Sequence, residues 1–351
     1  MYRTKTWMIV AAMACASGIS FAQTASSPQN ESGPMSTTRQ PLVVVTGAST
    51  GEGISYLPFT LMKEHKLVEK QAAKYGVQVA TEWQRFPKPI PMREALVDGK
   101  IAFAAGGVTQ LLATWELTRN TDNKVKGIGT LNSMPLTLIS SNPSVKALTD
   151  FTAKDKIAVP TVRTSIQAVV LAMASEKAFG KGQADKIEPF TMFMSHPDAT
   201  KALINGNSEV NAHVSSAPFV YDELAKPEVH KVLDSYDVLG GPHTYNAVWT
   251  STKFHDANPK IVEAYIAALE EAHEMIKADP AAAAALWLRT ENIENITPAQ
   301  VEAIIRDPQN EWTTTPKKFM AFATFMNQIG QMPTKPASLQ DLFFGNIKGG
   351  D

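Results

Sequence analysis

The residues best suited to chemistry lie in the stretch 156–167, where a short buried strand is followed by a turn and a helix start. Thr164 and Gln167 have the spacing of a capping box, which predicts a helix that begins near Thr164. The first turn of a helix has unpaired N–H groups and the positive end of the helix dipole, and Arg163 adds a positive charge beside it. Such a turn suits a bound anionic group. The alternative is that Thr164 and Gln167 only cap the helix, while Arg163 points into solvent.

Other turns place small or hydroxyl-bearing residues between a predicted strand and a predicted helix. Gly106 and Gly107 follow one strand. Ser215 and Ser216 follow another, and Ser216 is expected to cap the next helix. The Gly-rich loop 47–53 leads from the first predicted strand into a helix and can bring backbone N–H groups toward a ligand. In open α/β sheets, ligands bind at such carboxyl ends of strands.

Aromatic and histidine side chains near these turns have two interpretations each. Tyr56, Phe219 and Trp249 could cover an organic tail or pack in the core, and a strand position favours the core for Trp249. His213, at the end of a predicted strand, could donate to an oxyanion or be a histidine satisfied by its neighbours. His196 precedes Pro-Asp and is interpreted as a helix-start residue.

Enzymatic interpretations find little support in the sequence. The glycines at 47, 51 and 53 match a dinucleotide fingerprint of short-chain dehydrogenases, but none of the seven tyrosines has the lysine four residues later that those enzymes need. The seven histidines show neither HExxH nor paired metal spacing, and no G-x-S-x-G nucleophile motif occurs. We therefore expect no catalytic residues, no metal and no cofactor.

The N-terminal residues predict export. Arg3 and Lys5 precede a short apolar run, and Ser20-Phe-Ala fits a cleavage site, so 1–22 is interpreted as a signal peptide. Cys15 is the only cysteine and gives a weak lipoprotein signal. We expect cleavage after residue 22 in preference to lipid attachment at Cys15. Residues 23–40 are rich in Ser, Thr, Pro and Gln and predict a flexible leader. Loss of two basic residues takes the net charge from −1 to −3, which disfavours nucleic acid as a partner.

Hydrophobic patterning predicts strands that alternate with helices, which is typical of an α/β fold with parallel βαβ units. Strands are expected over 42–46, 77–83, 101–105, 125–131, 135–141, 156–159, 188–193, 209–214 and 245–251. Helices are expected over 57–66, 92–98, 108–117, 164–178, 199–204, 219–225, 259–278, 280–288, 298–305 and 316–329.

Several short motifs occur in an order that is known from one family. They are Pro58–Lys70, Arg93-Glu-Ala-Leu-Val-Asp-Gly99, Lys154–Pro160 followed by Thr164-Ser165, Ala202-Leu-Ile-Asn-Gly206, and Ala217-Pro218. Their succession resembles that of the sulfonate/taurine/nitrate-type periplasmic substrate-binding proteins of ABC importers, which are related to thiamine-pyrimidine binders. The resemblance covers about residues 42–290. The longer glycine-rich first loop and Arg163 depart from the usual family pattern.

The resemblance implies a two-domain α/β periplasmic binding protein of type II-like architecture, with a ligand cleft between the domains. Hinge crossovers are expected near 132–135 and 240–245. Domain 1 would comprise 41–133 plus 244–351, and domain 2 would comprise 134–243. The implied partners are a small-molecule ligand and the membrane subunits of an ABC permease, and we expect a periplasmic monomer.

The expected ligand is a small organic anion, a sulfonate or a carboxylate, with or without an aromatic body. The helix starts should converge on the cleft, and Arg163→Ala should then weaken binding at least about tenfold. The alternatives are a neutral pyrimidine or thiamine precursor, and a short-chain dehydrogenase-like enzyme. The candidate ligand-binding residues are Ser55, Tyr56, Gly107, Thr109, Asn132, Arg163, Thr164, Ser165, His213, Ser215 and Ser216.

Overall fold

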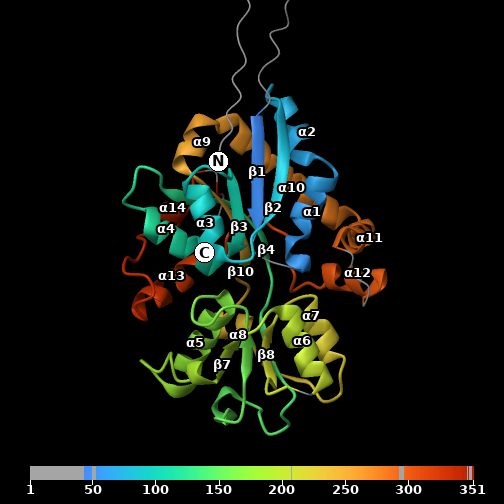
Figure 1. Ribbon diagram of the computed structural model, residues 1–351, viewed down its shortest axis with the longest axis vertical. Helices are drawn as coiled ribbons and strands as arrows, with labels where there is room; N and C mark the ends of the chain where they lie inside the picture. The colour runs from blue at the N-terminus through green and yellow to red at the C-terminus, as the bar shows by residue number, and fades with distance from the viewer. Residues whose placement is uncertain (1–42, 50–52, 207, 292–295, 346, 348–349) are drawn as a thin grey trace, which may run out of the picture. The chain divides into compact units, whose positions relative to one another are not determined.

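The computed structural model describes residues 43–49, 53–206, 208–291, 296–345, 347 and 350–351 (Figure 1). Gln40–Asp351 form one compact unit by their contacts. The expected signal peptide 1–22 with Cys15 and the leader 23–40 lie outside the described residues, and so do residues 50–52 of the Gly-rich loop. Among the helices that are described, none is both long enough and apolar enough to cross a membrane.

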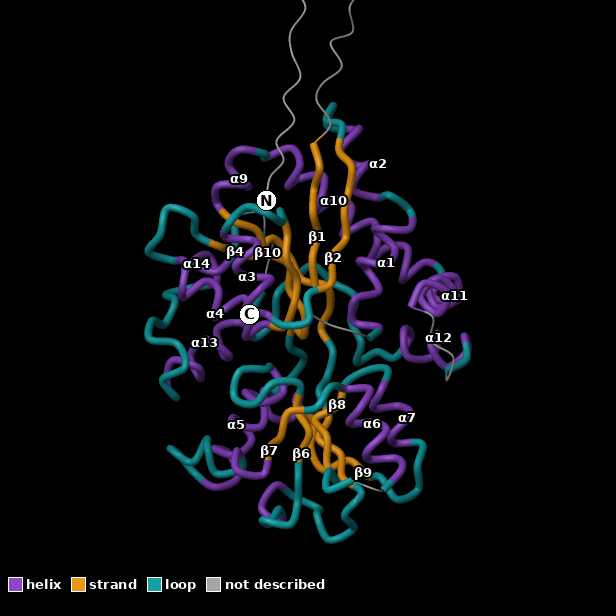
Figure 2. The backbone as a smooth tube through the Cα atoms, viewed as in Figure 1, coloured by secondary structure: helices purple, strands orange, loops and turns teal. Residues whose placement is uncertain are grey.

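Two five-stranded sheets form the centre of the described residues (Figure 2). The first has the order β2-β1-β3-β10-β4 and contains β1 (Val43–Ser49), β2 (Val79–Arg85), β3 (Phe103–Gly107), β4 (Val125–Ser133) and β10 (Thr244–Ser251). The second has the order β7-β6-β8-β5-β9 and contains β5 (Thr137–Ser140), β6 (Ile157–Val159), β7 (Thr191–Phe193), β8 (Ala212–Ser215) and β9 (His230–Asp234). The chain therefore leaves the first sheet after β4 and returns to it in β10.

Strand direction follows from these connections. β1 is parallel to β2 and β3, and β6 is parallel to β7 and β8, as the alternating pattern predicted. Two strands lie outside the βαβ pattern: β10 is antiparallel to β3 and β4, and β5 is antiparallel to β8 and β9. β5 follows β4 through residues 134–136 without a helix, and β10 enters from the other sheet. Neither strand is joined to its neighbours by the helical crossover that parallel pairing requires.

Helices cover both faces of the first sheet (Figure 1). α10 packs against α1 and α2, whereas α3 and α4 pack on β3 and β10. The single helix expected over 57–66 ends earlier, because Lys66 adopts a left-handed conformation with φ 50° and a new helix begins at Leu67. The helices of this part are α1 (Leu57–Glu64), α2 (Leu67–Lys74), α3 (Pro89–Val97), α4 (Val108–Thr118), α9 (Thr252–Ala257) and α10 (Pro259–Ala278).

The second sheet lies between α5 (Ile166–Phe179) with α8 (Ser235–Leu239) and α6 (His196–Asn205) with α7 (Phe219–Leu224) (Figure 1). The strand expected over 188–193 begins only at Thr191, because Glu188–Phe190 with its proline forms a 3₁₀ turn. His196 is the first residue of α6, as the sequence indicated.

Two predicted helix caps are wrong. Ser165, not Thr164, caps α5, and its Oγ accepts a hydrogen bond from the N–H of Ala168 at 3.2 Å. The residue before α7 is Pro218, and the Ser216 side chain takes no part in capping. In α5 the hydroxyl next to the observed start accepts from the first turn, whereas α7 starts after Pro218 without a side-chain cap, and spacing in the sequence does not distinguish these cases. Gln167 and Ser216 are thereby left for other contacts.

The C-terminal helices return to both sheets. α13 packs on α4 and on α5, and thus connects the two halves of the described unit. α11 and α12 pack on each other, and α11 also packs on α1. The bounds are α11 (Pro280–Glu291), α12 (Pro298–Arg306), α13 (Phe319–Gln328) and α14 (Leu339–Leu342). One large hydrophobic cluster includes residues of both sheets.

Candidate functional site

The starts of α4 and α5 meet. Thr109, in the first turn of α4, donates its Oγ1 hydrogen to the carbonyl of Thr164 at 2.9 Å. A Cβ atom added to Gly107 would lie 3.4 Å from Cγ2 of Ile166, the first residue of α5. The residue before α4 therefore lies against the first residue of α5, so the two helix N-termini, one from each half of the unit, are close together.

Tyr245 joins this contact to the turn that precedes α7. Its hydroxyl lies 3.3 Å from Nε2 of Gln167 and 3.3 Å from Oγ of Ser216. All three side chains are buried. Burial raises the pKa of Tyr245 above its ordinary value, so the phenol keeps its proton and can donate or accept.

The first loop reaches the same region. Asn132 donates from Nδ2 to the carbonyl of Ser55 at 2.5 Å. Gly53 has φ 93°, and a Cβ atom there would lie 3.4 Å from the ring of Phe219 and 3.4 Å from the carbonyl of Ala217. The turn before Ser55 and Tyr56 thus lies against the turn before α7. Only glycine adopts this conformation without strain.

We call this region the junction. It consists of Gly53, Ser55, Gly107, Thr109, Asn132, Thr164, Gln167, Ser216, Tyr245 and Asn246. Asn246 belongs to it because β10 pairs Asn246 with Gly107 on one side and with Asn132 on the other. None of these residues is charged.

Two buried polar groups at or next to the junction have no hydrogen-bond partner among the described residues. They are Nδ2 of Asn246, whose residue is 2% exposed, and Oγ of Ser215, whose residue is fully buried. Buried polar groups in proteins are nearly always paired, so unpaired ones indicate a missing partner. A polar ligand would provide one.

Histidines extend the polar contacts away from the junction. Nε2 of Gln167 lies 3.1 Å from Nε2 of His196, and Nδ1 of His196 lies 2.8 Å from Nε2 of His213. Nδ1 of His213 lies 2.7 Å from Oε1 of Glu223. His213 therefore has partners at both ring nitrogens. The pKa of His196 lies well below 6.5. Burial is the main cause, and the neighbouring His213 is the second.

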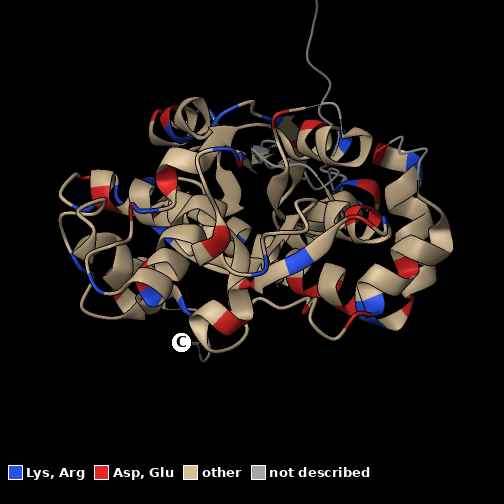
Figure 3. Ribbon diagram, turned by 90° about the horizontal axis from the view of Figure 1, so that it is seen from below, with Lys and Arg blue, Asp and Glu red and all other residues tan. Residues whose placement is uncertain are grey.

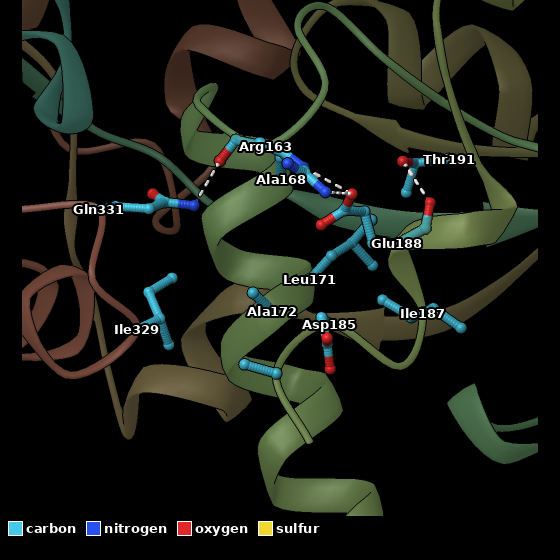
Figure 4. Close-up of a pocket in the computed structure, with 11 residues that line it drawn as sticks. Arg163, Ala168, Leu171, Ala172, Asp185, Ile187, Glu188, Thr191, Ile329 and Gln331 are labelled. Atoms are coloured by element: carbon cyan, nitrogen blue, oxygen red, sulfur yellow. Dashed lines mark hydrogen bonds and ion pairs between the residues drawn. The ribbon is translucent and has the colours of Figure 1, made fainter. Parts of the chain in front are cut away.

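Arg163 does not lie with the other candidates. Its guanidinium donates from Nε to Glu188 at 2.6 Å, and its side chain is 68% exposed. Both residues line a separate pocket of about 210 Å³ beside α5, together with Leu171, Ile329 and Gln331 (Figure 4). Gln331 donates to the carbonyl of Arg163 at 3.1 Å. The positive charge of Arg163 is thus neutralised locally, away from the junction.

The aromatic candidates separate clearly. Phe219 stacks on His196 with ring centroids 5.4 Å apart and planes at 13°. Tyr56 is 9% exposed and lies near Phe59, with centroids 6.4 Å apart. Trp249 is 1% exposed and packs beside Gly106 in the core. Phe219 and Tyr56 border the junction, and Trp249 does not.

Charged residues of both signs are spread over the helices and loops (Figure 3). In the part of the chain that the structure describes, no group of three or more His, Cys, Asp and Glu residues has the arrangement of a metal site. The junction can therefore bind through neutral donors and helix N-termini, but it offers no described lysine or arginine.

Sequence reasoning identified the four turns but missed Gln167, His196, Tyr245 and Asn246 as members of one polar cluster. Gln167 was interpreted as a cap and Tyr245 as an ordinary strand residue. A signal did exist for Asn246, because asparagine is depleted in strands and this strand is buried on both faces.

Known structures share this fold. The alkanesulfonate-binding protein SsuA from Xanthomonas axonopodis pv. citri, bound to MOPS, superposes with a TM-score of 0.63 at 17% identity, over 84% of this chain and 95% of that one. The periplasmic aliphatic sulphonate-binding protein SsuA from Escherichia coli gives 0.63 at 19% identity, over 86% and 99%. The periplasmic nitrate-binding protein NrtA from Synechocystis PCC 6803 gives 0.61 at 14% identity, over 86% and 84%.

Comparison of the sequence with protein-family models and with curated proteins found no match. The likeness to the solved structures is therefore one of fold. It confirms the predicted α/β periplasmic-binding-protein architecture, and the similar structures include sulfonate- and nitrate-binding proteins, the group that the sequence motifs resemble.

Proposed function

We propose that the chain is an extracytoplasmic solute-binding protein of an ABC importer, which captures a small organic anion at the junction and delivers it to a membrane permease. The observation that carries the proposal is the convergence of α4 and α5, through Thr109 and Thr164, on a buried polar cluster between two sheets. The unpaired Nδ2 of Asn246 is a donor available to a ligand there. In this role the chain carries its ligand and does not transform it.

An anion is the ligand class that fits these donors. The N-termini of α4 and α5 present positive dipole ends and unpaired N–H groups, and they do so without a counter-charge on a side chain. The solved structures with this fold include binders of sulfonates and of nitrate. We therefore propose a sulfonate or a carboxylate for this chain. A neutral pyrimidine would use the stacked rings of Phe219 and His196 instead.

The proposed site keeps most of the residues that the sequence indicated and adds Gln167, Tyr245 and Asn246. Arg163 is set aside because its guanidinium is held by Glu188. The retained residues of the junction are Ser55, Gly107, Thr109, Asn132, Thr164 and Ser216, and Tyr56, Ser165 and Ser215 lie next to them in the chain. His213 is set aside because both of its ring nitrogens have partners.

Ligand entry requires the two halves to separate. We propose domain 1 as 41–133 plus 244–351 and domain 2 as 134–243, with rotation about the two segments that join the sheets. Gly240 and Gly241, in the return segment, have φ of 73° and 137°, which suits a segment that absorbs large backbone changes. Closure is held by contacts such as that of the Tyr221 hydroxyl with Asp307 at 2.6 Å.

A ligand panel tests the proposal on the exported, processed chain, which we expect in the periplasm as a monomer. Methanesulfonate, benzenesulfonate, taurine, benzoate, nitrate and a hydroxymethylpyrimidine are compared by thermal shift, because only ligands of the native state raise the melting temperature. Sulfonates or carboxylates are expected to raise it. A rise with the pyrimidine alone would replace the proposal with its alternative, and no rise with any compound would contradict both.

A pair of variants then locates the site. Ser216→Ala removes the hydroxyl next to Tyr245 and is expected to weaken the best-binding anion by roughly three- to tenfold, the usual effect of one lost hydrogen bond. Ser144→Ala is the matched control, because Ser144 is exposed on a distant turn. Equal affinities of the two variants in calorimetric titration would remove the junction from the proposal.

A further inference from the structure

A row of hydrogen bonds leads from a buried carboxylate to the junction. It runs from Glu223 to His213, then to His196, Gln167 and Tyr245, with successive distances of 2.7, 2.8, 3.1 and 3.3 Å. The residues come from α7, β8, α6, α5 and β10, so only the tertiary structure aligns them. We call this row the relay.

One set of proton positions satisfies the relay when both imidazoles are neutral. His213 donates from Nδ1 to Glu223 and accepts at Nε2, while His196 donates from Nδ1 to His213 and accepts at Nε2 from the Gln167 amide. Gln167 also donates to the Tyr245 hydroxyl. The N–H groups of both imidazoles and one N–H of the Gln167 amide then point toward Glu223, whose carboxylate oxygen accepts, while the second amide N–H points to Tyr245.

The surroundings of the relay contain little positive charge. Glu223 is fully buried; Oε1 accepts from Thr200 and His213, and Oε2 has no partner among the described residues. His196 faces Gln167, His213, Phe219 and, through Gln167, Tyr245. The nearest acid on its own helix, Asp198, is exposed and accepts from the Ser195 hydroxyl.

This arrangement has a consequence for an anion. A second negative charge placed at the junction would share a poorly solvated region with the carboxylate of Glu223, and like charges there repel strongly. A proton on the imidazole pair between them would add a positive charge that attracts both the anion and the carboxylate of Glu223. An anion at the junction thus favours the charged form of His196, which burial otherwise keeps neutral.

We infer that the relay loads the site with a proton, so that the junction binds its anion together with about one H⁺, held as imidazolium on His196. This inference rests on the proposed function. On protonation, His196 keeps its Nδ1–H toward His213 and gains a proton at Nε2, and the Gln167 amide turns its carbonyl oxygen toward that new N–H. No covalent bond changes, and the proton comes from solvent.

Calorimetry measures the proton directly. Binding of methanesulfonate, benzenesulfonate and benzoate is titrated at pH 7.5 in buffers of different ionisation enthalpy. The slope of the observed binding enthalpy against the ionisation enthalpy of the buffer gives the number of protons taken up. We expect a value near one, and affinity that falls about tenfold per pH unit as the pH rises above neutrality. Methanesulfonamide, a neutral analogue, is expected to bind weakly and without uptake.

Variants assign the proton to the relay. Glu223→Gln keeps an acceptor for His213 but removes the charge, so anion binding should continue with uptake near zero and little pH dependence. His196→Asn should likewise abolish uptake, and circular dichroism shows whether each variant is folded. The control His65→Asn removes an exposed histidine and should leave uptake unchanged.

The outcomes separate the two proposals. Anion binding without proton uptake in the unmodified chain overturns the inference and leaves the proposed function standing. Uptake that persists in both folded relay variants also overturns it. Failure of every anion to bind overturns the proposed function, and the inference with it.

Discussion

The junction and the pocket beside Arg163 handle charge in opposite ways. The junction is lined by hydroxyls, amides and helix N-termini, its side chains Gln167, Ser216 and Tyr245 are buried, and burial holds the pKa of the neighbouring His196 well below 6.5. The other pocket is open, and its arginine is 68% exposed and bound to a carboxylate that is 31% exposed. An exposed ion pair is screened by water and binds a further anion weakly. Fixed dipoles in a site that excludes water stabilise an anion more strongly than they would in water.

The comparison shows that a charged side chain is a poor guide to an anion site. Arg163 is the residue that chemistry suggests first, yet its charge is already compensated. The residues without charge, such as Gly107 and Asn246, are the ones that the fold places between two helix starts. The following predictions test this contrast, from the largest expected effect to the smallest.

The neutral imidazoles of the interior predict a loss of stability in acid. His273 donates from Nε2 to the carbonyl of Leu131, and burial lowers its pKa from 6.5 to about 4. Because the unfolded chain binds a proton that the folded chain does not, this stability is complete above pH 6.5 and is lost as the pH falls toward 4. The full effect is roughly 3 kcal/mol.

Urea unfolding between pH 6.5 and pH 4 measures this predicted loss of stability. The unmodified chain should lose stability more steeply than His273→Gln, by up to about 1.4 kcal/mol per pH unit. His65→Asn, at the surface, should follow the unmodified chain. Parallel curves for His273→Gln and the unmodified chain would show that this histidine is protonated, or solvated, in the folded state.

Gly107→Val should prevent the starts of α4 and α5 from meeting. The Cβ atom alone would touch Cγ2 of Ile166 at 3.4 Å, so the two methyl groups of valine are expected to crowd this contact. Overpacking costs roughly 1–3 kcal/mol, which corresponds to roughly ten- to hundredfold weaker anion binding. Gly345→Val is the control, since no atom lies within 4 Å of a Cβ there. Titration calorimetry that finds unaltered affinity for Gly107→Val would place the ligand elsewhere.

Tyr245→Phe removes the hydroxyl that joins Gln167 and Ser216. The two buried side chains lose a partner, and such a loss costs about 1–2 kcal/mol. We expect anion affinity to fall roughly tenfold, with little change in the far-UV circular dichroism spectrum. Tyr75→Phe, on a partly exposed helix end, is the matched control and should bind normally. A Tyr245→Phe protein that binds as tightly as Tyr75→Phe would exclude the hydroxyl from the site.

Arg163→Ala should have the smallest effect. The sequence alone predicted at least a tenfold loss of affinity, whereas the exposed pair with Glu188 predicts less than about a twofold change, because such pairs contribute little. Calorimetric titration with the best-binding anion decides between these two values. A tenfold loss would mean that Arg163 leaves Glu188 and turns to the ligand.

Much of the fold was predictable because its signals are local. The strand expected over 156–159 is observed at Ile157–Val159, and α10 begins and ends at Pro259 and Ala278 as the pattern indicated. The break at Lys66 and the cap at Ser165 were not predicted, because each depends on backbone conformations that several sequences tolerate.

In the candidate site, too, the local features were predictable and the contacts between distant segments were not. The sequence by itself determined which turns join strands to helices, because hydrophobic period, glycines and hydroxyl side chains act over a few residues. Only the tertiary structure decided that Gln167 meets Tyr245, 78 residues away, that His196 meets His213, and that Arg163 is bound by Glu188. Those partners are chosen by packing between distant segments, and no pattern confined to one segment can specify them.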